Sequence, residues 1–156
     1  MSESNEYIAD RSRWGRGPWD FETDDKVVWV DSATDLDCMI VRNGVGAWCG
    51  YVGLPPEHPD HGKEYMEVFG EYDVHGGLTF ASACGGKICH VPEPGRPVHV
   101  WWLGFDCNHS SDAAPTNWVT RSLSMQGLWD SWGTYRTQPW VVSEVERLAA
   151  QANSYL

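Results

Sequence analysis

The sequence predicts a single-domain α+β protein in which an antiparallel-rich β-sheet carries one C-terminal α-helix. Three observations support this fold class: short apolar runs typical of strands, a turn signal between two of these runs, and one helical periodicity near the C-terminus. A chain of 156 residues with 42% hydrophobic residues suits one domain built around one core. We expect an N-terminal arm over residues 1–26 and an α+β core over residues 27–156.

The expected strands are recognised by their apolar and β-branched content. The runs 38–42 and 47–52 flank Asn43-Gly44, and because Asn and Gly tolerate positive φ, this arrangement predicts a β-hairpin with a longer linker. The segment 98–105 is apolar on both faces, which is typical of a strand inside a sheet. Further strands are expected at 27–30, 78–83 and 88–91.

One helix is predicted near the C-terminus. Val141, Val145 and Leu148 recur with the spacing that places apolar side chains on one helical face. Pro139 lies just before this stripe, at a position where a first helical turn tolerates proline. A single helical turn is also expected at 64–69.

Charge and composition narrow the classes of partner. The net charge is −11, and most of the acidic excess lies in residues 1–75. An acidic protein repels duplex nucleic acid and anionic membranes, whereas a small nucleotide needs only one or two local cations. No run of about 18 apolar residues is present, so we expect no membrane-spanning segment, and the polar N-terminus predicts a cytoplasmic protein.

Five cysteines bear on redox state and metal binding: Cys38, Cys49, Cys84, Cys89 and Cys107. Because the count is odd and no export signal is seen, we expect reduced thiols and no disulfide. Zinc could be held by Cys84, Cys89 and His90 together with Cys107 and His109, but the paired Cys-x-x-Cys motifs of zinc ribbons are absent, so no metal is assigned. Cys107 as a nucleophile beside His109 is a further alternative.

Side chains suited to chemistry gather in two segments. The first is His75-Gly76-Gly77-Leu78-Thr79, where the glycines let the backbone approach a ligand closely. The second is the polar loop that follows the apolar segment 98–105. We assign catalytic roles to His75, Asp106 and His109, and ligand contacts to Gly76, Gly77, Thr79, Trp48, Trp102, Asn108, Ser110, Asp112 and His58.

The two segments could act together on a phosphodiester. Asp106 lies three residues before His109, so a loop can bring the carboxylate to the imidazole and fix its tautomer. Two histidines with an orienting aspartate can serve as general acid and base without a metal ion. The same residue types also order loops through Asx and Ser turns, and this structural alternative stays open.

Aromatic and basic side chains suggest how a nucleotide could be held. Ten tryptophans are present, and some of their rings are expected at pocket walls where a base could stack. Arg42, Arg121 and Arg136 are the cations expected to neutralise a phosphate. His58 and His61 lie in a proline-rich loop that could form a lid over the pocket or simply be solvated. A small domain so rich in Trp is also expected to form a homo-oligomer.

Four blocks carry a resemblance to a known family: CMIVRNGVGAWCGYVGLPPEHPDHG (38–62), VHGGLTF (74–80), ICHVPEPG (88–95) and WWLGFDCNH (101–109). In combination they resemble an uncharacterised family of small phage, prophage and actinobacterial proteins. The chain departs from that family at Asn108, where the family has Ala, and at 135–139, where the family has a Tyr-Arg-Asp run.

The resemblance implies a phage or prophage origin and a cytosolic setting, but no activity. By analogy of context, small phage accessory proteins often neutralise host defences, some of them by acting on nucleotide signals. We therefore expect a phage-derived accessory protein that binds a small nucleotide-like ligand, and the sequence leaves open whether it also cleaves the ligand. The alternative is a non-catalytic interaction module whose polar motifs only order loops.

Overall fold

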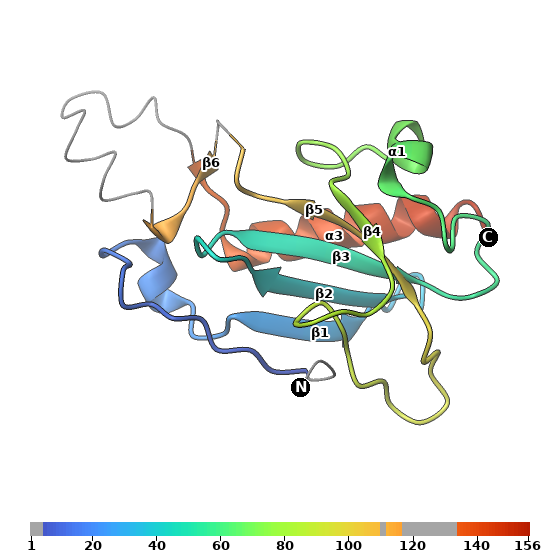
Figure 1. Ribbon diagram of the computed structural model, residues 1–156, viewed down its shortest axis with the longest axis horizontal. Helices are drawn as coiled ribbons and strands as arrows, with labels where there is room; N and C mark the ends of the chain where they lie inside the picture. The colour runs from blue at the N-terminus through green and yellow to red at the C-terminus, as the bar shows by residue number, and fades with distance from the viewer. Residues whose placement is uncertain (1–4, 110–111, 117–133) are drawn as a thin grey trace.

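The protein folds around a mixed set of strands and helices (Figure 1). The computed structural model describes residues 5–109, 112–116 and 134–156. The described elements, in chain order, are η1 (Pro18–Phe21), β1 (Lys26–Val30), β2 (Asp37–Arg42), β3 (Trp48–Leu54), α1 (Tyr65–Val68), η2 (Phe69–Glu71), β4 (Phe80–Ser82), β5 (Trp101–Asp106), β6 (Asp112–Ala113), β7 (Thr134–Tyr135) and α3 (Gln138–Asn153).

A five-stranded antiparallel sheet with the order β1-β2-β3-β5-β4 forms the centre of the molecule. The predicted hairpin is confirmed as β2 and β3, whose linker is held by the Asn43 side chain, which accepts hydrogen bonds from the backbone N–H of Val45 and Ala47. The predicted interior strand is confirmed as β5, although it begins at Trp101 rather than at position 98. The α+β prediction is therefore correct.

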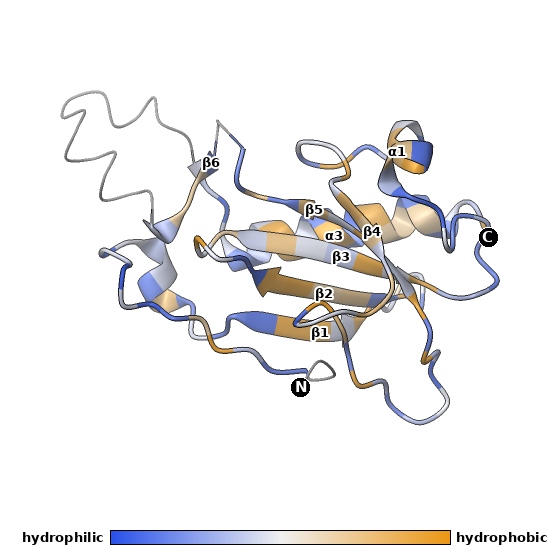
Figure 2. Ribbon diagram, viewed as in Figure 1, coloured by the Kyte–Doolittle hydropathy of each residue, from blue (hydrophilic) through white to orange (hydrophobic). Residues whose placement is uncertain are grey.

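Helix α3 lies across one face of the sheet, behind β2 and β3 in Figure 1. Its predicted apolar stripe of Val141, Val145 and Leu148 is fully buried. The sheet has room for the helix because β3 carries Gly50, where a Cβ would lie 2.5 Å from Val145 Cγ2. Figure 2 shows apolar stretches along the strands and along the helix that covers them. A second, smaller hydrophobic cluster, which includes Trp102, lies on the other face of the sheet.

The segment after β4 differs from the prediction in two respects. Residues 88–91 form no strand: Ile88 closes a tight turn with Gly85, with which it exchanges two backbone hydrogen bonds, and residues 89–91 follow this turn without regular structure. This turn brings the Cα atoms of Cys84 and Cys89 to 4.5 Å, and the two cysteines form a disulfide. The prediction of no disulfide is therefore wrong, because an odd total does not prevent a local pair from meeting. The other three cysteines are free and buried.

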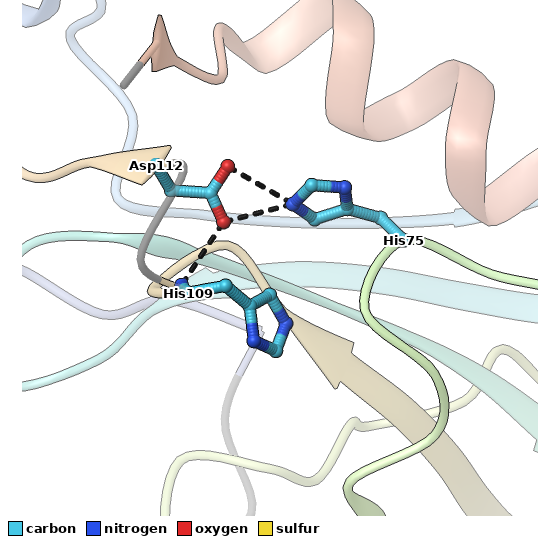
Figure 3. A group of neighbouring side chains, drawn as sticks. All are labelled: His75, His109 and Asp112. Atoms are coloured by element: carbon cyan, nitrogen blue, oxygen red, sulfur yellow. Dashed lines mark hydrogen bonds and ion pairs between the residues drawn. The ribbon is translucent and has the colours of Figure 1, made fainter. Parts of the chain in front are cut away.

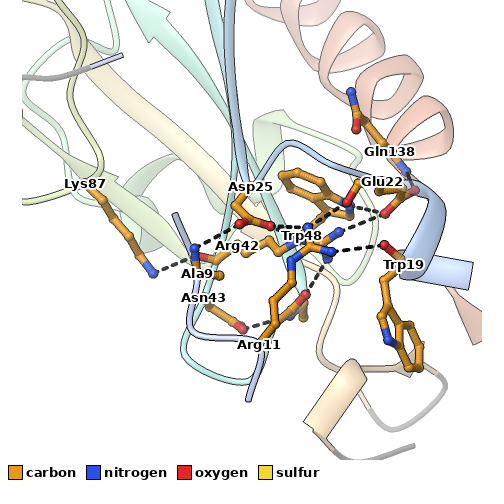
Figure 4. A network of polar contacts seen from close by, with 12 residues as sticks. Ala9, Arg11, Trp19, Glu22, Asp25, Arg42, Asn43, Trp48, Lys87 and Gln138 are labelled. Carbon is orange, nitrogen blue, oxygen red and sulfur yellow. Dashed lines mark hydrogen bonds and ion pairs between the residues drawn. The ribbon is translucent and has the colours of Figure 1, made fainter. Parts of the chain in front are cut away.

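A buried ionic network fastens the N-terminal arm to the sheet (Figure 4). The fully buried Arg42, at the end of β2, donates from Nε to Asp25 and from Nη2 to Glu22, both at 2.9 Å. Its Nη1 donates to the Gly46 carbonyl and to the Tyr135 hydroxyl at 2.7 and 2.9 Å. One side chain thus joins the arm, the hairpin and β7.

Several large apolar side chains remain exposed, among them Ile8, Phe21, Met66 and Val98. These residues are far apart in the sequence. The homo-oligomer expected from the Trp content stays a prediction. Within the described ranges, no helix is both long and apolar enough to cross a lipid bilayer.

Replacing Arg42 with methionine will destabilise the fold strongly. The change leaves the Glu22 carboxylate without the Arg42 guanidinium and leaves Asp25 paired with the partly exposed Arg11, which costs about 3–5 kcal/mol of the free energy of unfolding. Urea denaturation of both proteins measures the difference. As a control, Lys63→Ala removes a side chain that is 45% exposed and pairs loosely with Asp60 at 3.5 Å, and it should change stability by no more than about 0.5 kcal/mol. Equal losses in the two variants would contradict the role of the network.

His90 makes the stability of the fold depend on pH. Burial lowers its pKa more than the nearby Asp37 carboxylate raises it, and neither ring nitrogen has a hydrogen-bond partner. The His90 imidazole of the unfolded chain therefore binds a proton more readily than that of the folded chain. The free energy of unfolding is unaffected by this group above the ordinary histidine pKa of 6.5 and decreases as the pH falls below that value. Melting temperatures between pH 7.5 and 5 should fall less steeply for His90→Gln than for the native chain. The exposed His99, changed to Gln, should leave the slope as it is.

Candidate functional site

The His75 loop is held in place from both sides. The buried Val74 and Leu78 anchor its two ends in the core. The backbone N–H of His75 donates to Glu144 of α3 at 2.7 Å, and the backbone N–H of Thr79 donates to the Gly104 carbonyl of β5 at 2.9 Å. The imidazole of His75 is therefore presented from a loop that is fixed by the helix and by the sheet.

Asp112 is the centre of the cluster shown in Figure 3. It begins β6 and is almost fully buried. Its carboxylate accepts hydrogen bonds from His75 Nε2 at 2.8 Å, from the His109 backbone N–H at 3.0 Å and from Arg136 Nε at 3.0 Å. Burial raises the pKa of Asp112, but these hydrogen bonds outweigh burial and hold the pKa below its ordinary value. Because an ionised carboxylate only accepts, His75 carries its proton on Nε2.

His109 approaches His75 from the end of β5. The two rings meet edge to face with centroids 5.3 Å apart. His109 Nε2 lies 3.3 Å from Asp106 Oδ1, but the pair does not have hydrogen-bond geometry. This nitrogen is buried and has no hydrogen-bond partner among the described residues. The structure thus brings His75, Asp106 and His109 together, as the sequence predicts, while their catalytic roles stay predictions.

Gly76 makes this close approach possible. Its φ of +70° lies in the left-handed region that favours glycine, and a Cβ at this position would overlap the His109 imidazole. Gly77 has a similar φ of +83° and lies against the Phe69 ring. Gly76 therefore allows the two histidine rings to meet, whereas Gly77 packs against Phe69. The ligand contacts expected of both glycines stay predictions.

Two residues of α3 complete the site and were not identified from the sequence. The Trp140 ring lies 5.1 Å from that of His75, and the Arg136 guanidinium lies over the Trp140 ring at 4.7 Å. Glu144 holds the His75 backbone and pairs with Arg147 at 2.8 Å. The sequence could have indicated that they lie on one side of the helix. Trp140 and Glu144 are one helical turn apart, and each directly precedes a residue of the buried stripe.

Three of the expected ligand contacts and one of the expected cations lie elsewhere. Trp48 is fully buried beneath the Arg42 guanidinium, whose charge is already paired, so neither serves a ligand here. Trp102 belongs to the hydrophobic cluster on the sheet face opposite α3. His58 is buried and donates from Nε2 to the Ala152 carbonyl at 2.9 Å, which is a structural role rather than that of a lid. The sequence pattern shows that these residues pack, but not which face they occupy.

The other expected site residues have different outcomes. Thr79 and Asn108 are exposed beside the cluster, and the Asn108 backbone N–H donates to Asp106 at 3.1 Å. Ser110 and Arg121 lie outside the described residues. Burial raises the pKa of the Cys107 thiol, which argues against a nucleophile, and the disulfide removes Cys84 and Cys89 as zinc ligands.

The described residues do bring together one group of potential metal ligands. One ring nitrogen each of His75 and His109 and one carboxylate oxygen of Asp112 all lie within 4.8 Å of one another. The side chains of His75 and His109 are 15% and 30% exposed, so the group can be reached from solvent. Cavities of about 160 and 310 Å³ lie elsewhere, on either side of Arg96.

Replacing Gly76 with alanine will displace His109. The new methyl group occupies the place of the imidazole, and the positive φ adds backbone strain. NMR spectra of the imidazole groups should show shifted signals for His75 and His109, and the melting temperature should fall by several degrees. The matched control is Gly70→Ala, since a Cβ there meets nothing within 4 Å. Unchanged histidine signals in Gly76→Ala would show that the rings do not meet at this glycine.

In comparisons with protein-family models, curated proteins and solved structures, none matched this chain. The resemblance to small phage and actinobacterial proteins therefore stays a prediction.

Proposed function

We propose that this chain binds a small nucleotide-like phosphate ester at the cluster of His75, His109 and Asp112 and hydrolyses it. The observation that carries this proposal is the edge-to-face contact of two partly exposed imidazoles that come from separate segments. Each imidazole has its own carboxylate, Asp112 for His75 and Asp106 for His109. Paired imidazoles with carboxylate partners are common in sites that move protons or bind metal ions.

The surroundings of the cluster suit a nucleotide. Trp140 contributes a partly buried ring beside His75, where a base or ribose can pack against it. Arg136 pairs with Asp112 and remains partly exposed, at 23% of its side-chain surface. Phosphate oxygens accept hydrogen bonds from guanidinium and imidazole N–H groups. In this proposal Trp140 takes the stacking role that was expected of Trp48, and Arg136, one of the three expected cations, neutralises the phosphate.

Hydrolysis of a phosphate ester requires three events at such a site. The oxygen of a water molecule forms a bond to phosphorus, the ester P–O bond breaks, and the leaving oxygen takes up a proton. The partial exposure of both imidazoles admits water to the cluster. Asp112, ionised and held by Arg136, fixes the His75 ring for this reaction.

A phage setting would give this activity a purpose. By analogy of context, the ligand would be a nucleotide signal that a bacterial host uses in defence, and the protein would remove or sequester it. This part of the proposal rests on the sequence resemblance rather than on the geometry.

The rival function is that of an interaction module without catalysis. It is favoured by one observation: Asp112 ties together the His75 loop, the turn at His109 and Arg136, which is also what a purely structural carboxylate would do. The rival predicts that the site side chains matter for stability and not for any ligand.

The variant His109→Ala separates the two functions. Under the proposal, its melting temperature stays within about 2 °C of the native value, because the lost side chain is partly exposed and makes no hydrogen bond through Nε2. Its affinity for cyclic dinucleotides or ADP-ribose derivatives, measured by thermal shift, should weaken by about 1–3 kcal/mol. Chromatography should show that the variant forms no product.

The matched control is His99→Ala, which removes an exposed histidine that lines a different surface cavity. It should bind and cleave like the native chain. A large loss of stability in His109→Ala, with no ligand effect in the native protein, would favour the interaction module.

A further inference from the structure

We propose that His75, His109 and Asp112 form a zinc site that keeps a fourth position open for water or for a phosphate oxygen. This inference rests on the proposed function, because it names the cofactor of the same site. The ligand set consists of two imidazoles and one carboxylate. Three protein ligands with one open position are typical of zinc sites that act on substrates, whereas structural zinc sites are closed by four protein ligands.

The spacing of the three ligands suits an ion of this size. Zinc lies about 2.0–2.2 Å from nitrogen and oxygen donors, which places tetrahedral donors about 3.3 Å from one another. The three donor atoms lie within 4.8 Å of one another, and His75 Nε2 and Asp112 Oδ2 are 2.8 Å apart. Zinc binding would require the hydrogen bond between His75 and Asp112 to open and the His109 donor to move closer to the other two.

Further polar groups hold the ligands in the orientation that zinc requires. Arg136 Nε and the His109 backbone N–H both donate to Asp112, so its carboxylate cannot rotate freely. Glu144 accepts from the backbone N–H of His75 and so fixes the loop that carries the ring. Such outer partners are a regular feature of zinc sites, because they orient the ligating side chains.

His109 supplies an independent observation. Its Nε2 atom is buried, and no group of the described residues forms a hydrogen bond with it. The carboxylate nearest to it in the ion-pair geometry, that of Asp106, lies 3.3 Å away without hydrogen-bond geometry. An ion bound at this nitrogen would give it the partner that it lacks.

The ion would also supply the nucleophile for hydrolysis. Zinc lowers the pKa of a bound water to near neutrality, so that hydroxide forms at the open position. The hydroxide oxygen bonds to phosphorus, the ester P–O bond breaks with its electron pair going to the leaving oxygen, and that oxygen takes a proton from solvent. Water is the only reactant consumed besides the ester.

Zinc binding by the tag-free chain tests the inference without reference to catalysis. The protein is stripped with a chelator and titrated with Zn²⁺ in competition with a chromogenic chelator. We expect one equivalent to bind tightly. Titration with Co²⁺ should give visible absorption bands typical of a four- or five-coordinate site with nitrogen and oxygen ligands.

Variants show whether the ion lies at the proposed residues. His75→Ala and His109→Gln, both checked for folding by circular dichroism, should lose the tight equivalent. Asp106→Asn keeps all three ligands and should weaken binding, because it removes a negative charge that lies 3.3 Å from His109 Nε2. The control His99→Ala should bind zinc like the native chain. Unchanged stoichiometry and affinity in His75→Ala and His109→Gln would mean adventitious surface zinc and would overturn the inference.

A hydrolysis assay distinguishes this inference from the proposed function. Full hydrolysis by the stripped protein in excess chelator would overturn the zinc site and leave the proposed function standing. One bound zinc that is lost in His75→Ala and His109→Gln, without binding or cleavage of any nucleotide in the panel, would support the zinc site and reject the proposed function.

Discussion

A guanidinium group in the interior of a small domain has to be fully paired, and the pairing of Arg42 organises much of this molecule. The desolvation of a buried cation is offset only when opposite charges and hydrogen-bond acceptors surround it. Here the partners come from the arm, through Glu22 and Asp25, from the hairpin, through the Gly46 carbonyl, and from the segment before α3, through Tyr135. The arm is therefore part of the folded unit rather than an appendage.

The same network leads to the candidate site through two neighbouring residues. Tyr135, in β7, places its hydroxyl on Arg42, while the next residue, Arg136, donates to Asp112. Because successive side chains of an extended segment point in opposite directions, one short stretch of backbone serves both the network and the site. The parallel pairing of β6 with β7 keeps Asp112 beside this stretch. The position of His75 against Asp112 thus depends on contacts made well away from the imidazole.

The parts of the structure that could be predicted from the sequence are those encoded locally. His75 and His109 each lie at the end of an apolar segment, so their proximity followed from the expected packing of these segments. The sequence could not tell that Trp48 is buried whereas Trp140 is partly exposed. Periodicity does not show which face of a sheet a helix will cover. Arg42 carried no local sign of burial, since its partner Tyr135 lies 93 positions further along the chain. Pairings over such separations are decided by the whole fold.

The loop closed by Cys84 and Cys89 has a consequence for the opposite edge of the sheet. Lys26, the first residue of β1, is buried, and its ammonium group donates to the carbonyls of Lys87 and Cys89, both at 2.7 Å. The covalent ring holds these two acceptors at a fixed spacing. Reductive opening of the ring lets them separate, and the buried ammonium then loses part of its solvation. Reduction or oxidation of this disulfide is thereby coupled to the anchoring of the edge strand β1. The stability of that strand then depends on the reducing power of the compartment.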